Sequence, residues 1–171
     1  STIKGPHLAL EAAKKLGANL DLVGDTSITQ EPEYYKKCVE MCDGKDRKII
    51  GPANRGECVV FFSKAFCLLH PTKFFREPMG LAPVEAMACG CPVIAWKYGA
   101  LKETVKHGET GYLVNSVDEM VTYMRELSCR SFNSIKVMRE NCREWASQFS
   151  IERMVNRYEE LCVEAIESGG W

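Results

Sequence analysis

Short apolar segments alternate with longer amphipathic ones along the first two thirds of this chain, and this alternation strongly constrains its fold. Each apolar segment is three or four residues long, and the first three end at Gly or His. We expect strands at 20–23, 48–50, 66–69, 92–95 and 112–114, and helices at 5–16, 31–42, 54–65, 83–88 and 101–105. Strands that alternate with helices predict an α/β fold, a Rossmann-like parallel sheet with helices on both faces.

The last third of the chain has a different pattern. Apolar residues recur there at helical spacing, which predicts helices at 118–127, 134–149 and 151–167. Such stripes are more typical of core packing than of a cofactor site.

Composition narrows the class of protein. The chain has 171 residues, enough for one domain with its own core. Its formal net charge of −1 argues against a broad nucleic-acid-binding surface. No apolar run approaches the ~20 residues of a membrane span. Because the sequence begins at Ser1, without Met or a signal-peptide pattern, we expect a piece of a longer protein.

The nine cysteines indicate a reducing compartment, and we expect a cytoplasmic protein. Cys38 and Cys42 lie one helical turn apart, and Cys89 and Cys91 flank a glycine. Either pair could contribute to a metal site, but no nearby histidine completes a ligand set, so we expect no metal.

The loop-to-helix junction between Glu77 and Glu85 contains the main candidate binding residues. Glu77 and Glu85 stand with seven residues between them, and Pro83 lies where a first helical turn should be. Backbone amides at 80–82 would point out of the positive end of this helix and suit a phosphate. The carboxylates would repel phosphate, so they should hold sugar hydroxyls of the same ligand, as a nucleotide sugar provides. The alternative is an ordinary junction with two solvated glutamates.

Other candidate residues follow the predicted strands. Ligands of wound parallel sheets bind beyond the carboxyl ends of the strands. The segments 24–25, 51–53, 70–71 and the Glu77 loop all lie at such ends. These candidate residues should therefore share one rim of the sheet.

The segment from Glu77 to Ala95 closely resembles the signature of retaining GT-B glycosyltransferases of family 4 (glycosyl transferases group 1). The family form is E-P-F-G-L-x-x-x-E-A-M-A-x-G-x-P-V-I-A. Met79 stands here where Phe is usual, and Ala100 where a downstream Gly is usual; neither change removes a charged group. Segments 99–103 and 107–114 resemble the family's G-G-x-x-E and D-G-x-T-G-x-L-V. The resemblance covers nearly the whole chain.

The resemblance implies roles for single residues. Lys4 matches a Lys that binds the donor diphosphate, and the loop 51–53 matches one that holds the base through backbone groups. Glu77 would hold the hexose hydroxyls as the catalytic residue, and Glu85 the ribose hydroxyls. The expected donor-binding residues are Lys4, Gly51, Ala53, Met79, Gly80, Leu81, Ala82 and Glu85. No Asp-x-Asp motif occurs, and the resemblance implies catalysis without a metal or cofactor.

The resulting hypothesis is the C-terminal, donor-binding half of a GT-B enzyme that moves a hexose from a nucleotide-diphosphate sugar to an acceptor hydroxyl. Its own N-terminal acceptor domain is absent from this chain, so we expect the chain alone to be inactive. Peripheral membrane association would follow if the acceptor is a lipid. Two alternatives stay open at this point: a non-catalytic sugar-nucleotide binding module, and a related GT-B nucleotide-sugar epimerase.

Overall fold

A computed structural model describes residues 1–25, 31–73 and 76–169, and its elements follow the predicted order with small shifts at their ends. The strands are β1 (Leu20–Val23), β2 (Arg47–Gly51), β3 (Leu68–His70), β4 (Val93–Trp96) and β5 (Gly111–Val114). The helices are α1 (Pro6–Leu16), α2 (Pro32–Met41), α3 (Arg55–Lys64), α4 (Leu81–Ala88), α5 (Leu101–Thr104), α6 (Val117–Cys129), α7 (Phe132–Ala146) and α8 (Ile151–Glu167). Two 3-10 turns, η1 (Thr2–Lys4) and η2 (Ser147–Phe149), complete the set of described elements.

The described strands pair in parallel, as predicted, but they form two hydrogen-bonded groups. β1 pairs with β2, and β4 lies between β3 and β5. Leu22 is opposite Ile49 in the first group, and Ile94 is opposite Tyr112 in the second. Among the described residues the predicted parallel pairing is therefore confirmed, and it is divided between these two groups. An apolar run specifies that a segment is a strand, but it does not specify which strand lies beside it.

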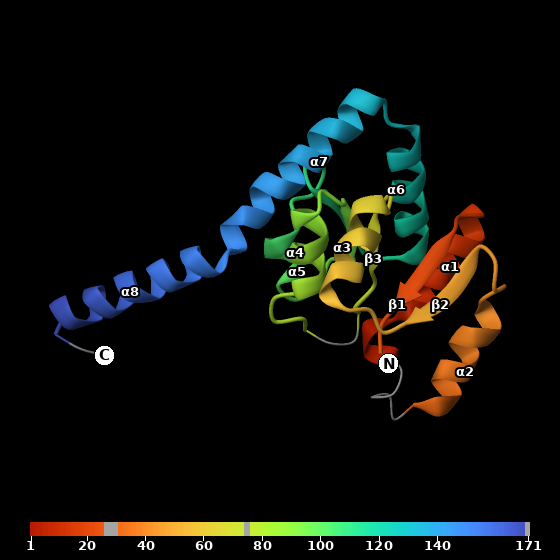
Figure 1. The fold of residues 1–171 in the computed structure, drawn as a ribbon, viewed down its shortest axis with the longest axis horizontal. Coiled ribbons are helices and arrows are strands. Elements are labelled where there is room, and N and C mark those ends of the chain that lie inside the picture. Colours follow the sequence, from red (N-terminus) through yellow and green to blue (C-terminus); the bar gives the residue numbers. More distant parts are fainter. Residues whose placement is uncertain (26–30, 74–75, 170–171) are drawn as a thin grey trace.

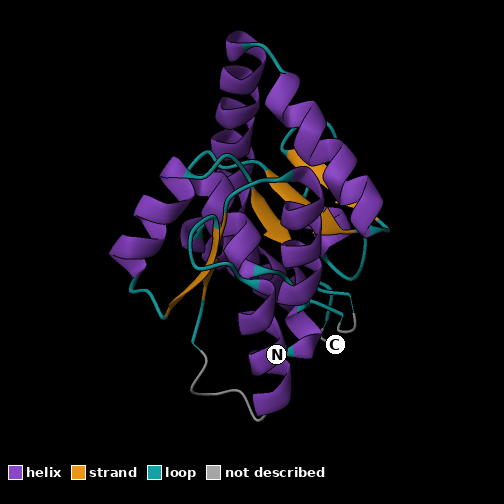
Figure 2. Cartoon of the chain, turned by 90° about the vertical axis from the view of Figure 1, so that its right-hand side faces the viewer, coloured by secondary structure: helices purple, strands orange, loops and turns teal. Residues whose placement is uncertain are grey.

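Helices cover these strands on both sides, and the core lies around β4 (Figures 1 and 2). All four β4 residues are buried, which requires cover on both faces of the strand. Both α4 and α6 contact β4, while α7 packs against α4 and α1 packs against α6. The α/β class with helices flanking parallel sheets is thereby confirmed.

The last helix departs from expectation. α6 and α7 bury their apolar stripes, as predicted, but none of the residues of α8 is buried. Figure 1 shows α8 extending away from the body of the molecule at the left, attached through η2. Its apolar residues are exposed: Ile151, Met154, Val155, Tyr158, Leu161, Val163 and Ile166. Core packing is therefore not the role of this stripe within the described part of the chain; the family resemblance implies instead a final helix that crosses back onto another domain, and an uncovered strip agrees with that.

None of the described helices combines the length and the apolar character that a membrane crossing requires.

Candidate functional site

The loop that carries Glu77 leads into α4. Gly80 is the N-cap of this helix, with a left-handed backbone (φ 80°), and Pro83 is buried in the first turn, as predicted. The helix begins at Leu81, so the amides at its start belong to the residues expected to meet a phosphate. Met79 and Leu81 are exposed, and Ala82 is half-buried. The junction is thus open to solvent where a ligand would approach.

Lys4 reaches this loop from the opposite end of the chain. Its Nζ lies 2.5 Å from Oε2 of Glu77, and the Glu77 side chain is only 12% exposed. A close backbone approach makes the contact possible: a Cβ on Gly5 would stand 2.6 Å from the carbonyl oxygen of Pro71. Because Gly5 has φ 65° and no side chain, η1 can lie against the segment that follows β3.

His70, the last residue of β3, completes a three-residue cluster with Lys4 and Glu77. Its Nε2 lies 3.7 Å from Oε2 of Glu77, and a hydrogen bond of 3.1 Å joins Nε2 to the hydroxyl of the buried Thr72. Burial lowers the pKa of His70 to about 4, although the Glu77 carboxylate opposes that shift. At neutral pH the imidazole is therefore uncharged, and Lys4 is the cation of this cluster.

Glu85 lies one turn inside α4 and is exposed. Gly80, the N-cap of the same helix, lies against Glu77: a Cβ added to Gly80 would stand 3.4 Å from Cγ of Glu77. The structure therefore places both glutamates around one helix start, in agreement with the sequence prediction. Their roles toward a ligand stay predictions.

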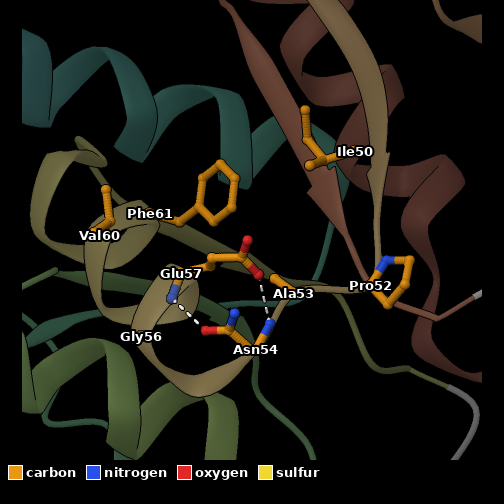
Figure 3. A pocket seen from close by; sticks show the side chains of 8 residues that line it. All are labelled: Ile50, Pro52, Ala53, Asn54, Gly56, Glu57, Val60 and Phe61. Atoms are coloured by element: carbon orange, nitrogen blue, oxygen red, sulfur yellow. Dashed lines mark hydrogen bonds between the residues drawn. The ribbon is translucent and has the colours of Figure 1, made fainter.

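A separate pocket of about 440 Å³ lies at the end of β2 (Figure 3). Its walls are largely apolar, and they are formed by Ile50, Pro52, Ala53, Asn54, Gly56, Glu57, Val60 and Phe61. Ala53, predicted to bind the donor, belongs to the pocket; Gly51 ends β2 immediately before it. A polar edge comes from the capping box of α3, in which the Asn54 side chain accepts from the Glu57 amide and Glu57 accepts from the Asn54 amide.

The loops that precede α3 and α4 both lie at the lower edge of the molecule in Figure 1, near the N-terminus. The two helices also pack against each other. Side-chain contacts bring Lys4, His70 and the Glu77 loop together, as predicted; the loop after β2 lies on the same side of the molecule in Figure 1. The predicted segment 24–25 lies, as expected, directly after the end of β1.

Sequence reasoning gave little weight to His70 and did not select Thr72 or the residues that hold the loop from behind. A strand that ends in His-Pro-Thr was visible, but the distance from His70 to Glu77 depends on the fold. Among the described residues, no group of three or more His, Cys, Asp or Glu side chains is arranged to hold a metal ion. All nine cysteines are free thiols.

Comparison with known sequences adds to this geometry. The sequence model of the family "Glycosyl transferases group 1" matches residues 1–145. An uncharacterized glycosyltransferase of Methanocaldococcus jannaschii is 30% identical over 164 residues, which cover 92% of this chain and 45% of that protein. D-inositol 3-phosphate glycosyltransferase 1 of Catenulispora acidiphila is 28% identical over 184 residues, 98% of this chain and 43% of that protein.

Solved structures show the same fold. HepE of Anabaena, crystallised with UDP, superposes with a TM-score of 0.85 at 25% identity, over 96% of this chain and 46% of HepE. Sucrose-phosphate synthase of Thermosynechococcus elongatus gives a TM-score of 0.83 at 25% identity, over 99% of this chain and 44% of that protein. The chain spans less than half the length of each of these relatives.

Proposed function

We propose, since the chain belongs to the family of glycosyl transferases group 1, that it is the C-terminal, donor-binding half of a retaining hexosyltransferase of family 4. The observation that carries the proposal is the contact of Lys4 with Glu77 beside the start of α4. A cation, a carboxylate and free helix amides are thereby assembled at one place. These are the groups that a nucleotide-diphosphate sugar needs.

The phosphates of the donor would lie at the amides of residues 80–82, with Lys4 as the counter-cation. Lys4 now contacts Glu77, so a diphosphate would draw its Nζ away from that carboxylate. Glu77 would then be available to accept hydrogen bonds from hexose hydroxyls. His70 is neutral, so it adds no positive charge that would hold Glu77 back.

The remaining parts of the donor match the rest of the rim. Glu85 is exposed one turn into α4 and would accept hydrogen bonds from the ribose hydroxyls. The apolar pocket after β2 would receive the base, with Gly51 and Ala53 contributing backbone groups. The Anabaena neighbour binds UDP, which makes UDP the first nucleotide to test.

In the proposed reaction the bond between the anomeric carbon and the diphosphate breaks, and the diphosphate keeps the electron pair. Lys4 and the α4 amides stabilise the charge that develops on it, a role that fixed positive groups can fill without a metal. Glu77 orients the hexose while the acceptor oxygen bonds to the anomeric carbon from the same face, and the proton of the acceptor hydroxyl passes to the departing diphosphate oxygen. No residue of this chain is assigned as a nucleophile.

The partner in this proposal is an N-terminal acceptor domain of the same protein. The chain covers less than half of its relatives, and α8 presents an apolar face, with Ile151 72% and Ile166 78% exposed. Such a face is typical of a surface that another domain covers. The free cysteines favour a cytoplasmic protein, and a lipid acceptor would bring the whole enzyme to a membrane surface.

Calorimetric titration with UDP and UMP tests the site. UDP should bind at least about tenfold more tightly than UMP, because the second phosphate meets Lys4 and the helix start. Lys4→Met should remove most of that preference, while Lys14→Met, at an exposed position of α1, should leave it intact. Equally weak binding of both nucleotides at millimolar concentration would overturn the assignment.

Product analysis separates the function from its alternatives. The two-domain protein, incubated with UDP-glucose and a panel of acceptors, should transfer the hexose, and the isolated chain should not, because orientation of the acceptor is lost. Donor binding without turnover would indicate a binding module. Conversion of the sugar without transfer would indicate an epimerase.

A further inference from the structure

The main chain of Glu77 is held by contacts of its own, separate from those of its carboxylate. The amide of Ala100 donates a hydrogen bond of 3.0 Å to the carbonyl oxygen of Glu77. Gly99 makes this approach possible, since a Cβ there would stand 2.8 Å from both the nitrogen and the oxygen of Glu77. The backbone from which the Glu77 side chain projects is therefore fixed by the start of α5.

Thr104, the last residue of α5, adds a second attachment two residues further along the loop. Its single hydroxyl proton is shared between two carbonyl oxygens, that of Met79 at 3.2 Å and that of Ala100 at 2.6 Å. Thr104 is only 2% exposed, so no water replaces this hydroxyl without a rearrangement. One hydroxyl therefore ties the Glu77 loop to the turn that holds it.

α5 is a single turn of four residues, too short to be stable by its own hydrogen bonds. Its position is set from α7: Nε1 of Trp145 donates a hydrogen bond of 2.8 Å to the carbonyl oxygen of Thr104. The indole itself is held by Lys106, whose Nζ lies 3.9 Å from the ring centre, and by the edge of Phe149. α7 packs in turn against α4, the helix at which the phosphates are expected.

We propose that Thr104, supported by Trp145, is a positioning residue of the donor site that sets the place of Glu77 relative to the start of α4. The proposal rests on the function proposed above. Thr104 itself is buried behind the loop and acts through the main chain of residues 77–79. A hexose held by a displaced Glu77 would be misaligned with its diphosphate, whereas UDP, which lacks the hexose, would not report the displacement.

The test compares Thr104→Val with Thr104→Ser in the two-domain protein. Valine keeps the shape and removes the hydroxyl, and serine restores the hydroxyl. Thr122→Val is the control, because the Thr122 hydroxyl makes the same kind of bond to a carbonyl oxygen four residues earlier, that of Asp118 on α6. Trp145→Phe removes the supporting donor and keeps an aromatic ring.

We expect Thr104→Val to lower kcat for transfer from UDP-glucose at least about tenfold, since small misplacement of a reacting group is costly. Thr104→Ser should stay within about threefold of the parent, Trp145→Phe should fall between them, and the Kd for UDP should not change. Amide hydrogen exchange should quicken in peptides covering residues 76–82 and 100 in Thr104→Val but not in Thr122→Val. That readout needs no activity.

Three results would overturn the proposal: an unchanged kcat in Thr104→Val, an equal loss in Thr122→Val, or unaltered exchange in the Glu77 loop. Failure of the proposed function looks different. If the proposed function itself is wrong, Glu77→Gln will leave transfer intact, or UDP will not bind the parent protein.

Discussion

The two loops of the proposed donor site are built in opposite ways. The loop before α4 (residues 76–80) carries a nearly buried carboxylate that contacts Lys4 and His70 and is held from behind by Ala100. The loop after β2 (residues 51–54) borders an apolar pocket and is fixed by a capping box at its own helix. The first loop would recognise a ligand mainly through charged side chains, and the second mainly through the shape of its pocket and its backbone groups. Substitutions in the first should therefore be costly and specific to one part of the ligand.

The largest effect concerns pH and His70 in the charged loop. Its folded pKa of about 4 lies below the ordinary 6.5, so between these values the unfolded chain binds a proton that the folded chain does not. The free energy of unfolding should therefore fall by about 3 kcal/mol as the pH drops through this window. Urea denaturation at pH 7 and pH 4 measures the loss.

His70→Gln should remove that part of the acid sensitivity, while His107→Gln, at an exposed position, should retain it. Equal pH dependence in all three proteins would show that the charged loop is no more coupled to the fold than an exposed site.

Glu77→Gln comes next. It should weaken UDP-glucose by roughly ten- to a hundredfold, the value of a hydrogen bond to a charged group, about 1.5–3 kcal/mol. UDP should bind at least as well as before, because the variant also releases Lys4 from its carboxylate partner. Calorimetry with both ligands measures the two effects. A similar loss for UDP and UDP-glucose would remove the assignment of Glu77 to the hexose.

Glu85→Gln should reduce the affinity for UDP and UDP-glucose alike, by about tenfold, because both contain the ribose. Glu140→Gln on α7, an equally exposed glutamate paired with Lys136, is the control and should change neither. Compared with Glu77→Gln, this variant shows which glutamate binds the ribose and which binds the hexose. Selective loss of UDP-glucose alone would exchange the two assignments.

The smallest effect is expected in the loop after β2. Asn54→Ala breaks the capping box and should lower the free energy of unfolding by about 1 kcal/mol, whereas Asn54→Ser keeps a capping oxygen and most of the stability. UDP affinity should change less than about threefold, since the pocket contributes mainly apolar contact and backbone groups. A loss of UDP affinity as large as that of Glu85→Gln would show that side chains of the second loop matter as much for binding as those of the first.

Local chemistry made much of this site predictable from the sequence. A helix was expected to begin at position 54, where Asn54 caps α3; Pro83 was expected in the first turn of α4, and Glu77 and Glu85 were expected to flank one helix start. Each of these depends on residues within one turn or one loop, where stereochemistry leaves few alternatives. The burial of the α6 and α7 stripes followed from helical spacing in the same way.

Contacts between distant parts of the chain were less accessible. Lys4 meets Glu77 across 73 positions because of a close approach at Gly5, and spacing alone carries no sign of it. The sequence does not indicate that the Thr104 hydroxyl contacts Met79 in addition to the carbonyl of Ala100 at the start of its own helix. The stripe of α8 resembles that of α7 in spacing, and spacing does not tell that the chain covers the one and not the other. The family resemblance supplied Lys4 where residue physics could not.

The attachment of α8 by one end has a consequence for how the chain unfolds. A 17-residue helix that buries none of its residues is marginally stable in water, since nucleation is costly and propagation gains little per residue. Heating should therefore melt α8 well before the body around β4, and the unfolding of the isolated chain should not be a single cooperative transition. A covering domain would merge the two transitions, so the cooperativity of melting reports directly on whether that domain is in place.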